Sequence, residues 1–180
     1  MFLSVIDSRP VGFRLTLPHI TEEEGTMFAV PENTIALPQS HAALHPVRIA
    51  LDVAARRERW AHLLRYDPDT RFAALVEKTE RQEVWLMSWL PGQSADLHDH
   101  GATSGAFTVV SGALTEVVAP GPTQVLHHLV AGQSRVFGPN YVHQVRNDGA
   151  DPAVTIHVYR DGERTMRPFG FDPVTGPVPL

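Results

Sequence analysis

The chain has 180 residues, 43% hydrophobic and 19% charged, which is typical of one globular domain with a substantial core. Its net charge of -5 argues against nucleic acid or an anionic membrane surface as the main partner. Cysteine is absent, which excludes disulfides, cysteine-ligated zinc and a cysteine nucleophile.

The N-terminal part, residues 1–65, is expected to form an arm followed by a helical segment. Residues 1–43 carry scattered prolines, and their first stretch, MFLSVIDSRPVGF, lacks the pattern of a signal peptide. Residues 44–64, LHPVRIALDVAARRERWAHLL, space their apolar side chains as a helix does, with the single proline near the start. No segment approaches the roughly 18 apolar residues that cross a bilayer. We therefore expect a cytoplasmic protein whose N-terminal part ends in one helix over residues 44–64.

Residues 66–160 are expected to form a β-barrel. The turn YDPDT at residues 66–70 ends the helical part, and eight β-like runs then alternate with Gly, Pro, Asn and Asp. They are RFAALVEK, EVWLMSWLP, GAFTVVSG, LTEVVA, QVLHHLV, SRVFG, HQVRN and AVTIHVY. Such a series predicts an antiparallel sandwich or small barrel. Residues 161–180, rich in proline and glycine, are expected to wrap over the surface as a tail, so that residues 1–180 make a single, mainly β domain.

A histidine pair stands out in the stretch LHDHGATSG, residues 97–105. In a strand, His98 and His100 would face the same side, with Asp99 pointing away. A chance pair is the alternative, because the chain has ten histidines. Many iron and manganese sites complete such a pair with a carboxylate a few residues later, but Ser104 and Gly105 occupy that place.

A second block strengthens the metal interpretation. Together the two blocks resemble the cupin motifs G-x5-H-x-H-x3,4-E-x6-G and G-x5-P-x-G-x2-H-x3-N. The matching residues are Gly92, His98, His100, Gly112, Gly132, Pro139, His143 and Asn147. The glutamate is missing, one extra residue precedes the proline, and Asn140 replaces the second glycine. The resemblance implies a cupin jelly-roll barrel in which adjacent hairpins bring His143 to the first two histidines.

Three stretches resemble the bacterial form of the cysteine dioxygenase type I family of cupin thiol dioxygenases. LHDHGATSGAF has a glycine, Gly105, where the animal enzymes have a cysteine. WLPGQSADLHDH keeps a tryptophan, Trp89, nine residues before His98. AVTIHVY resembles the S-x-H-x-Y block of the family through Thr155, His157 and Tyr159. Alternation along a strand places these last three side chains on one face.

The resemblance implies iron(II), Fe²⁺, as the cofactor, bound by His98, His100 and His143. The substrates it implies are O₂ and a small carboxylate thiol, foremost L-cysteine, which would be oxidised to cysteine sulfinic acid. Three neutral ligands leave the metal charge to be met by a thiolate. Three histidines would equally suit zinc, so the ligand set alone does not identify the metal.

The resemblance also implies roles around the metal. Tyr159 would hydrogen-bond O₂ or place the substrate, oriented by His157, which Thr155 would support. The alternative for Tyr159 is ordinary strand packing. Arg71, 27 residues before His98, lies close to the spacing of the carboxylate-binding arginine of the family. We therefore expect Arg71 to bind a substrate carboxylate, with a surface arginine as the alternative.

The departures from the family fall around the substrate pocket. Gly105 precludes the cysteine–tyrosine cross-link, Asp69 replaces a tyrosine often found before the arginine, and the S-P-P that follows the tyrosine is missing. The 3-mercaptopropionate dioxygenases usually replace this arginine by glutamine and draw one from the C-terminal segment, where this chain has Arg160, Arg164 and Arg167.

The sequence therefore leaves open both the substrate and the kind of cupin protein. Alternative substrates are 3-mercaptopropionate and mercaptosuccinate, and other possibilities are another metal-dependent cupin oxygenase or decarboxylase, or a non-catalytic metal-binding cupin. The sequence indicates no protein partner and defines no oligomeric state.

Overall fold

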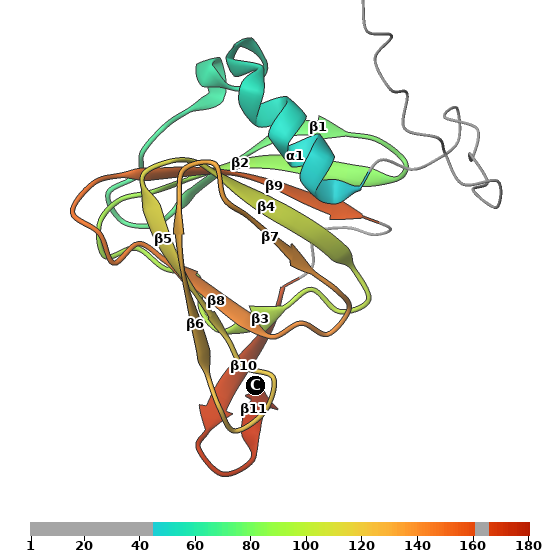
Figure 1. The fold of residues 1–180 in the computed structure, drawn as a ribbon, viewed down its shortest axis with the longest axis vertical. Helices are drawn as coiled ribbons and strands as arrows, with labels where there is room; N and C mark the ends of the chain where they lie inside the picture. Colours follow the sequence, from blue (N-terminus) through green and yellow to red (C-terminus); the bar gives the residue numbers. More distant parts are fainter. Residues whose placement is uncertain (1–44, 161–165) are drawn as a thin grey trace, which may run out of the picture. The chain divides into compact units, whose positions relative to one another are not determined.

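Two facing β-sheets surround the main core of the chain (Figure 1). The computed structural model describes residues 45–160 and 166–180, so the predicted N-terminal arm lies outside the described residues. The five-stranded sheet has the order β1-β2-β9-β4-β7, and the six-stranded sheet has the order β11-β10-β3-β8-β5-β6.

The strands of the five-stranded sheet are β1 (Phe72–Lys78), β2 (Gln82–Trp89), β4 (Ser104–Ser111), β7 (Ser134–Phe137) and β9 (Ala153–Arg160). Those of the six-stranded sheet are β3 (His98–Asp99), β5 (Ala113–Val118), β6 (Val125–Val130), β8 (His143–Arg146), β10 (Arg167–Asp172) and β11 (Gly176–Pro179). All pairs between neighbouring strands are antiparallel. All eight predicted β-runs are strands, and β3, β10 and β11 are additional.

The predicted helix over residues 44–64 is too long. Helix α1 covers Pro46–Ala55 and is followed by two short 3₁₀ turns, η1 (Arg57–Arg59) and η2 (Ala61–Leu63). His45 begins the helix, because its Nδ1 accepts a hydrogen bond from the backbone N–H of Val47 at 3.3 Å. The chain turns after α1 so that Trp60 is buried under it, where the indole N–H donates to the carbonyl of Ala54 at 3.4 Å.

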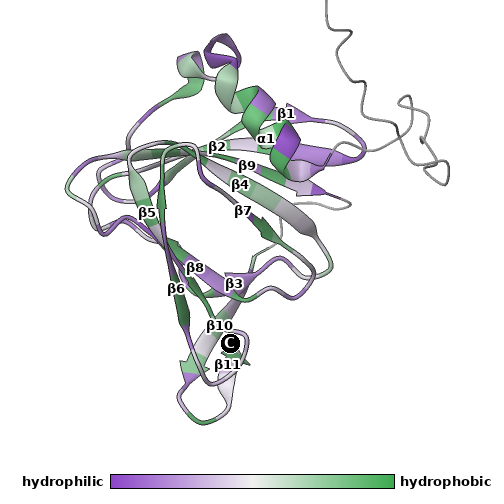
Figure 2. Cartoon of the chain, viewed as in Figure 1, coloured by the Kyte–Doolittle hydropathy of each residue, from purple (hydrophilic) through white to green (hydrophobic). Residues whose placement is uncertain are grey.

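Two apolar layers follow from the alternation of side chains along the strands. Met87 and Trp89 on β2 face the space between the sheets, where a core cluster forms with residues such as Phe107 and Phe137. Val84 and Leu86 face the opposite way and pack with α1 in a second cluster. Figure 2 shows hydrophobic residues spread along the strands of both sheets. This double use explains why β2 has buried apolar side chains on both of its faces.

The C-terminal tail, which was expected to wrap over the surface, forms two strands from residue 167 onward. Strands β10 and β11 pair with each other, and β10 pairs with β3, with Arg167 opposite Asp99 and Pro168 opposite His98. The tail therefore extends the six-stranded sheet beside the histidine pair. Among the described residues, no helix has the length and hydropathy needed to cross a membrane.

Candidate metal centre

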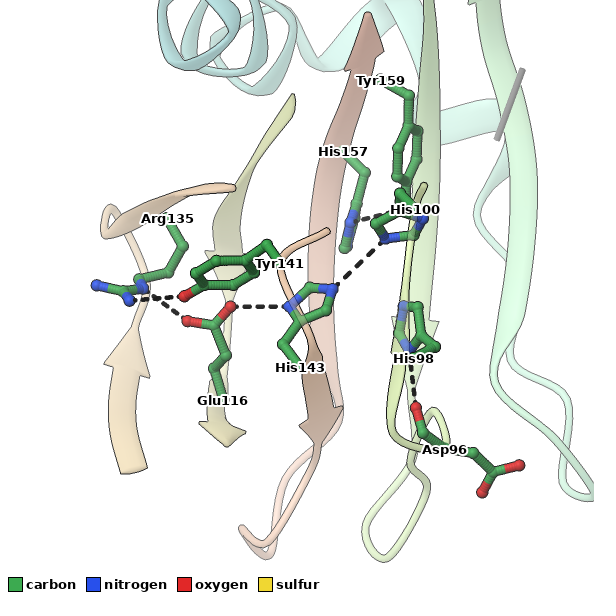
Figure 3. Close-up of polar contacts among 9 residues, drawn as sticks. All are labelled: Asp96, His98, His100, Glu116, Arg135, Tyr141, His143, His157 and Tyr159. Carbon is green, nitrogen blue, oxygen red and sulfur yellow. Dashed lines mark hydrogen bonds and ion pairs between the residues drawn. The ribbon is translucent and has the colours of Figure 1, made fainter. Parts of the chain in front are cut away.

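Three histidines from the six-stranded sheet converge between the two sheets (Figure 3). His98 lies on β3, His100 directly after it, and His143 begins β8, where it pairs with His98 in register. All three are at least 95% buried. One nitrogen from each lies within 4.8 Å of the others. Within the described part of the chain, these three histidines are the group that could hold a metal ion.

The hydrogen bonds of two rings direct their Nε2 atoms toward the common point. His98 Nδ1 donates to the carbonyl of Asp96 at 2.7 Å, and His143 Nδ1 donates to Glu116 at 2.9 Å. Each Nε2 then carries an unprotonated lone pair, and that of His143 lies 3.4 Å from Nε2 of His100. Burial, followed by the nearby His143, lowers the pKa of His98 to about 3. Neutral imidazoles with facing lone pairs are the form that binds a divalent transition metal, so the residues fit a metal ion.

The chain matches the family model described as cysteine dioxygenase type I over residues 47–170, which is more than half of its length. It belongs to the cysteine dioxygenase type I family. No match was found among curated proteins. The family and the three-histidine group together indicate a metal-dependent dioxygenase.

Solved structures agree on the fold. The TT1209 protein from Thermus thermophilus is 27% identical, with a TM-score of 0.50 over 56% of this chain and 91% of that chain. A protein from Klebsiella pneumoniae with a double-stranded β-helix domain is 24% identical, with a TM-score of 0.53 over 59% of this chain and 90% of that one. A recombinant oxalate oxidase in complex with glycolate is 16% identical, with a TM-score of 0.50 over 60% and 62%. These likenesses confirm the predicted cupin fold.

The family's S-x-H-x-Y block lies on β9, on the face turned toward the histidines. Trp89 Nε1 lies 3.0 Å from Thr155 Oγ1, which lies 2.9 Å from His157 Nε2. His157 Nδ1 lies 3.4 Å from the hydroxyl of Tyr159. The ring of Tyr159 packs edge-on against that of His100, with centroids 4.8 Å apart. The predicted strand face is therefore present, and it meets the metal-binding group.

All contacts in this chain of hydrogen bonds are satisfied by a donor order that starts at Trp89. An indole N–H can only donate, so Thr155 accepts from Trp89 and its own hydroxyl can donate to Nε2 of His157. The neutral imidazole then carries its proton on Nδ1, which donates to the oxygen of Tyr159. In this order, the hydroxyl proton of Tyr159 is left to donate to a partner other than His157.

Arg71 lines the same inner cavity as the three histidines and Tyr159. Its guanidinium lies 3.3 Å from the sulfur of Met87, 3.4 Å from that of Met166, and 5.3 Å from the ring centre of Trp89. Thioethers and an indole face are weak partners for a guanidinium compared with a carboxylate. The positive charge of Arg71 is also one of the smaller influences that lower the pKa of His98.

The inner cavity is small, and Met166 borders it on the outside. It offers about 10 Å³ of free space, and Met87, Ala95 and Val145 supply apolar parts of its lining. A hollow of about 380 Å³ shares Arg71, Ala95, His98 and Met166 with it. Met166, whose unbranched side chain adapts readily, therefore lines both spaces.

The other candidate arginines lie elsewhere. Arg160 lines a separate hollow with Arg59 and Glu77, under α1 on the outer face of the five-stranded sheet. Arg167 is held by Asp99, outside the metal-binding group. Arg164 lies outside the described residues. Among the described residues, Arg71 is the arginine that lines the inner cavity.

Gly105, which the resemblance aligns with a cysteine of the animal enzymes, lies opposite Tyr159 in the pairing of β4 with β9. A side chain does not fit there, because a Cβ would lie 2.5 Å from the ring of Phe137 and even closer to the carbonyl of Val158. The glycine therefore leaves Tyr159 without a covalent cross-link at this position and also allows the sheet to pack.

Sequence reasoning missed the residues behind His143. Glu116 on β5 is wholly buried and binds both His143 and Arg135, and Arg135 also donates to Tyr141 at 3.1 Å (Figure 3). Burial opposes the ionisation of Glu116, but the hydrogen bonds from His143 and Arg135 outweigh it, so its pKa lies below the ordinary value. One signal was available: a single acid interrupts the otherwise uncharged strand LTEVVA.

Proposed function

We propose that the chain is an iron(II)-dependent thiol dioxygenase that oxidises the sulfur of a small carboxylate thiol, foremost L-cysteine, to a sulfinic acid. The observation that carries this proposal is the meeting of three histidines with Arg71 in one cavity. The same residues suit both ends of such a substrate: a metal ion for its thiolate, and a guanidinium for its carboxylate.

Charge balance supports a thiolate substrate. His98, His100 and His143 would hold the iron without contributing charge, so a divalent ion there would favour an anionic ligand. Iron(II) bound at this site would supply the redox chemistry that allows O₂ to react with a thiolate sulfur. The product is one in which two oxygen atoms have been added to sulfur.

The chain's own residues would place the substrate and hold a proton. Arg71 would bind the carboxylate through paired N–H groups, exchanging its two thioether contacts for stronger ones. Tyr159, held by His157, would donate its hydroxyl proton to substrate or O₂. The buried apolar lining would exclude water, which strengthens both interactions.

The size of the cavity supports a small thiol. With about 10 Å³ free, the inner cavity would admit cysteine only if side chains of its lining moved. Mercaptosuccinate is larger and has a second carboxylate, for which the described lining offers no second arginine. We therefore rank L-cysteine and 3-mercaptopropionate, which each have one carboxylate, above it.

The deciding experiment measures O₂ consumption by the iron-loaded protein with L-cysteine, 3-mercaptopropionate, mercaptosuccinate and cysteamine, with product identification by mass spectrometry. We expect a sulfinic acid from L-cysteine at the highest kcat/KM, and no reaction from the zinc-loaded protein. Iron-loaded protein that is inert toward all four thiols would overturn the proposal. It would favour a different cupin oxygenase or a non-catalytic metal-binding protein.

A further inference from the structure

Glu116 is a carboxylate buried directly behind the third histidine of the metal centre. It lies on β5, which pairs with β8 so that Glu116 is opposite Val145 and Val118 is opposite His143. The side chain is 0% exposed. Its oxygens accept from two donors, His143 Nδ1 at 2.9 Å and Arg135 Nε at 2.6 Å. Each oxygen thus serves a different partner, one toward the metal centre and one away from it.

The contact with His143 has a chemical consequence for that ring. Accepting the Nδ1 proton of His143 holds the ring in the tautomer whose Nε2 faces His98 and His100. A negative acceptor also draws the proton toward itself, which makes Nε2 a stronger electron donor to a metal. Among the three histidines, His98 has instead a neutral backbone carbonyl, that of Asp96, at its Nδ1.

Arg135 opposes part of this effect. Its Nε binds Glu116, its Nη2 binds the hydroxyl of Tyr141, and its side chain is 28% exposed. Its positive charge therefore partly neutralises Glu116 and weakens the effect of that carboxylate on the metal centre. The four side chains of Arg135, Tyr141, Glu116 and His143 form a connected path in Figure 3.

We propose that Glu116 is a positioning residue. It acts on the metal centre through the ring of His143 and supplies the negative charge that the three histidines lack. Arg135 sets how strongly this charge acts on the metal, because it binds the same carboxylate. The cupin motif has a glutamate ligand where this chain has Ser104 and Gly105. Glu116, on a different strand, would replace its charge without binding the metal directly, because it acts through His143. This inference rests on the metal centre of the proposed function and does not depend on which thiol is oxidised.

The test uses the full chain with iron(II) and measures two quantities without any thiol. The first is the iron(II) dissociation constant, by anaerobic competition with a chromophoric chelator, and the second is the Fe(III)/Fe(II) midpoint potential. The variants are Glu116→Gln, which keeps the size and an oxygen acceptor but removes the charge, and Arg135→Gln. The control is Glu77→Gln, because Glu77 forms an ion pair with Arg59 under α1 on the outer face of the other sheet.

The two variants should move the potential in opposite directions. Glu116→Gln should weaken iron(II) binding by about 10- to 100-fold, the usual cost of losing a partner of a metal-binding histidine. It should also raise the potential, because less negative charge reaches the oxidised metal. Arg135→Gln should lower the potential, since Glu116 then has one donor fewer. Glu77→Gln should change neither quantity.

A purely structural ion pair gives a different result. In that case, Glu116→Gln and Arg135→Gln lower the melting temperature but leave the potential unchanged or shift it in the same direction, and the inference is overturned. If Glu116→Gln does not fold, the potential of Arg135→Gln decides alone. Both readouts need no turnover, so a protein inert toward thiols would refute the proposed function while leaving this inference testable.

Discussion

Arg167 binds Asp99 through two charged hydrogen bonds, Nε to Oδ1 at 2.7 Å and Nη2 to Oδ2 at 2.6 Å. Asp99 lies between the two histidines of the first metal-binding block and is buried, whereas Arg167 reaches it from β10 and stays half exposed. A third contact joins Arg167 to the side chain of Asn140, which has a left-handed φ of 57° in the turn before His143. The clamp thus ties the C-terminal strand to both metal-binding blocks.

Breaking this clamp should destabilise the chain and loosen the metal centre. In Arg167→Gln, the buried carboxylate of Asp99 loses its charged partner, a costly state even when a backbone N–H remains. We expect a lower melting temperature and weaker iron(II) binding, measured by calorimetry and chelator competition. Arg146→Gln removes an exposed ion pair with Asp148 and serves as the control. Equal effects of the two variants would contradict the role of the clamp.

The role of Arg71 stays a prediction that kinetics can check. Arg71→Ala should reduce kcat/KM for L-cysteine by about 10- to 100-fold, mainly through KM, because a charged hydrogen-bonded pair is lost. Cysteamine has the same thiol and amine without the carboxylate, so its kinetics should change little. Arg160→Ala, on the other face of the sheet, should leave both substrates unaffected. An equal loss for the two thiols would show that Arg71 does not bind the carboxylate.

Met166 should set the size of the accepted thiol. It lines both the inner cavity and the outer hollow, so Met166→Ala would join the two spaces. We expect the ratio of kcat/KM for mercaptosuccinate to that for L-cysteine to rise in Met166→Ala. Met166→Leu, which nearly conserves volume, should leave the ratio near that of the unaltered protein. The expectation fails if the alanine variant changes both substrates in proportion.

Gly105 should tolerate no side chain. In Gly105→Ala, the new methyl group would meet Phe137 and the backbone of β9, which predicts a loss of about 1–3 kcal/mol in the free energy of unfolding. Gly138→Ala is the matched control, because a Cβ there would have nothing within 4 Å. Urea denaturation measures both. Similar unfolding midpoints for the two variants would contradict the close packing seen at Gly105.

The strands could be predicted because the alternation of their side chains and the turn residues between them indicate the same strand boundaries. On β9, the same alternation that buries Ile156 under α1 turns Thr155, His157 and Tyr159 inward. Both the strand and its inward face could therefore be predicted. The histidine group was predicted through the spacing of two blocks, and the structure brings its three members together.

Features that depend on contacts between residues distant in sequence could not be predicted from alternation or spacing. Helical spacing continues past Ala55, but burial of Trp60 ends the helix there. Strand β3 has only two residues and exists because β8 and β10 lie on either side of it. The partnership of Glu116 with His143 joins positions 27 residues apart, and periodicity carries no information about it.

The site is divided between the two sheets. His98 and His143 lie on strands of the six-stranded sheet, and His100 directly follows β3. Arg71 instead precedes β1, and Tyr159 lies on β9 of the five-stranded sheet. Under the proposed function, changes near β1 and on β9 would alter the choice of thiol while the histidines keep their geometry. In such a division, one wall of the cavity would select the substrate and the other would hold the metal ion.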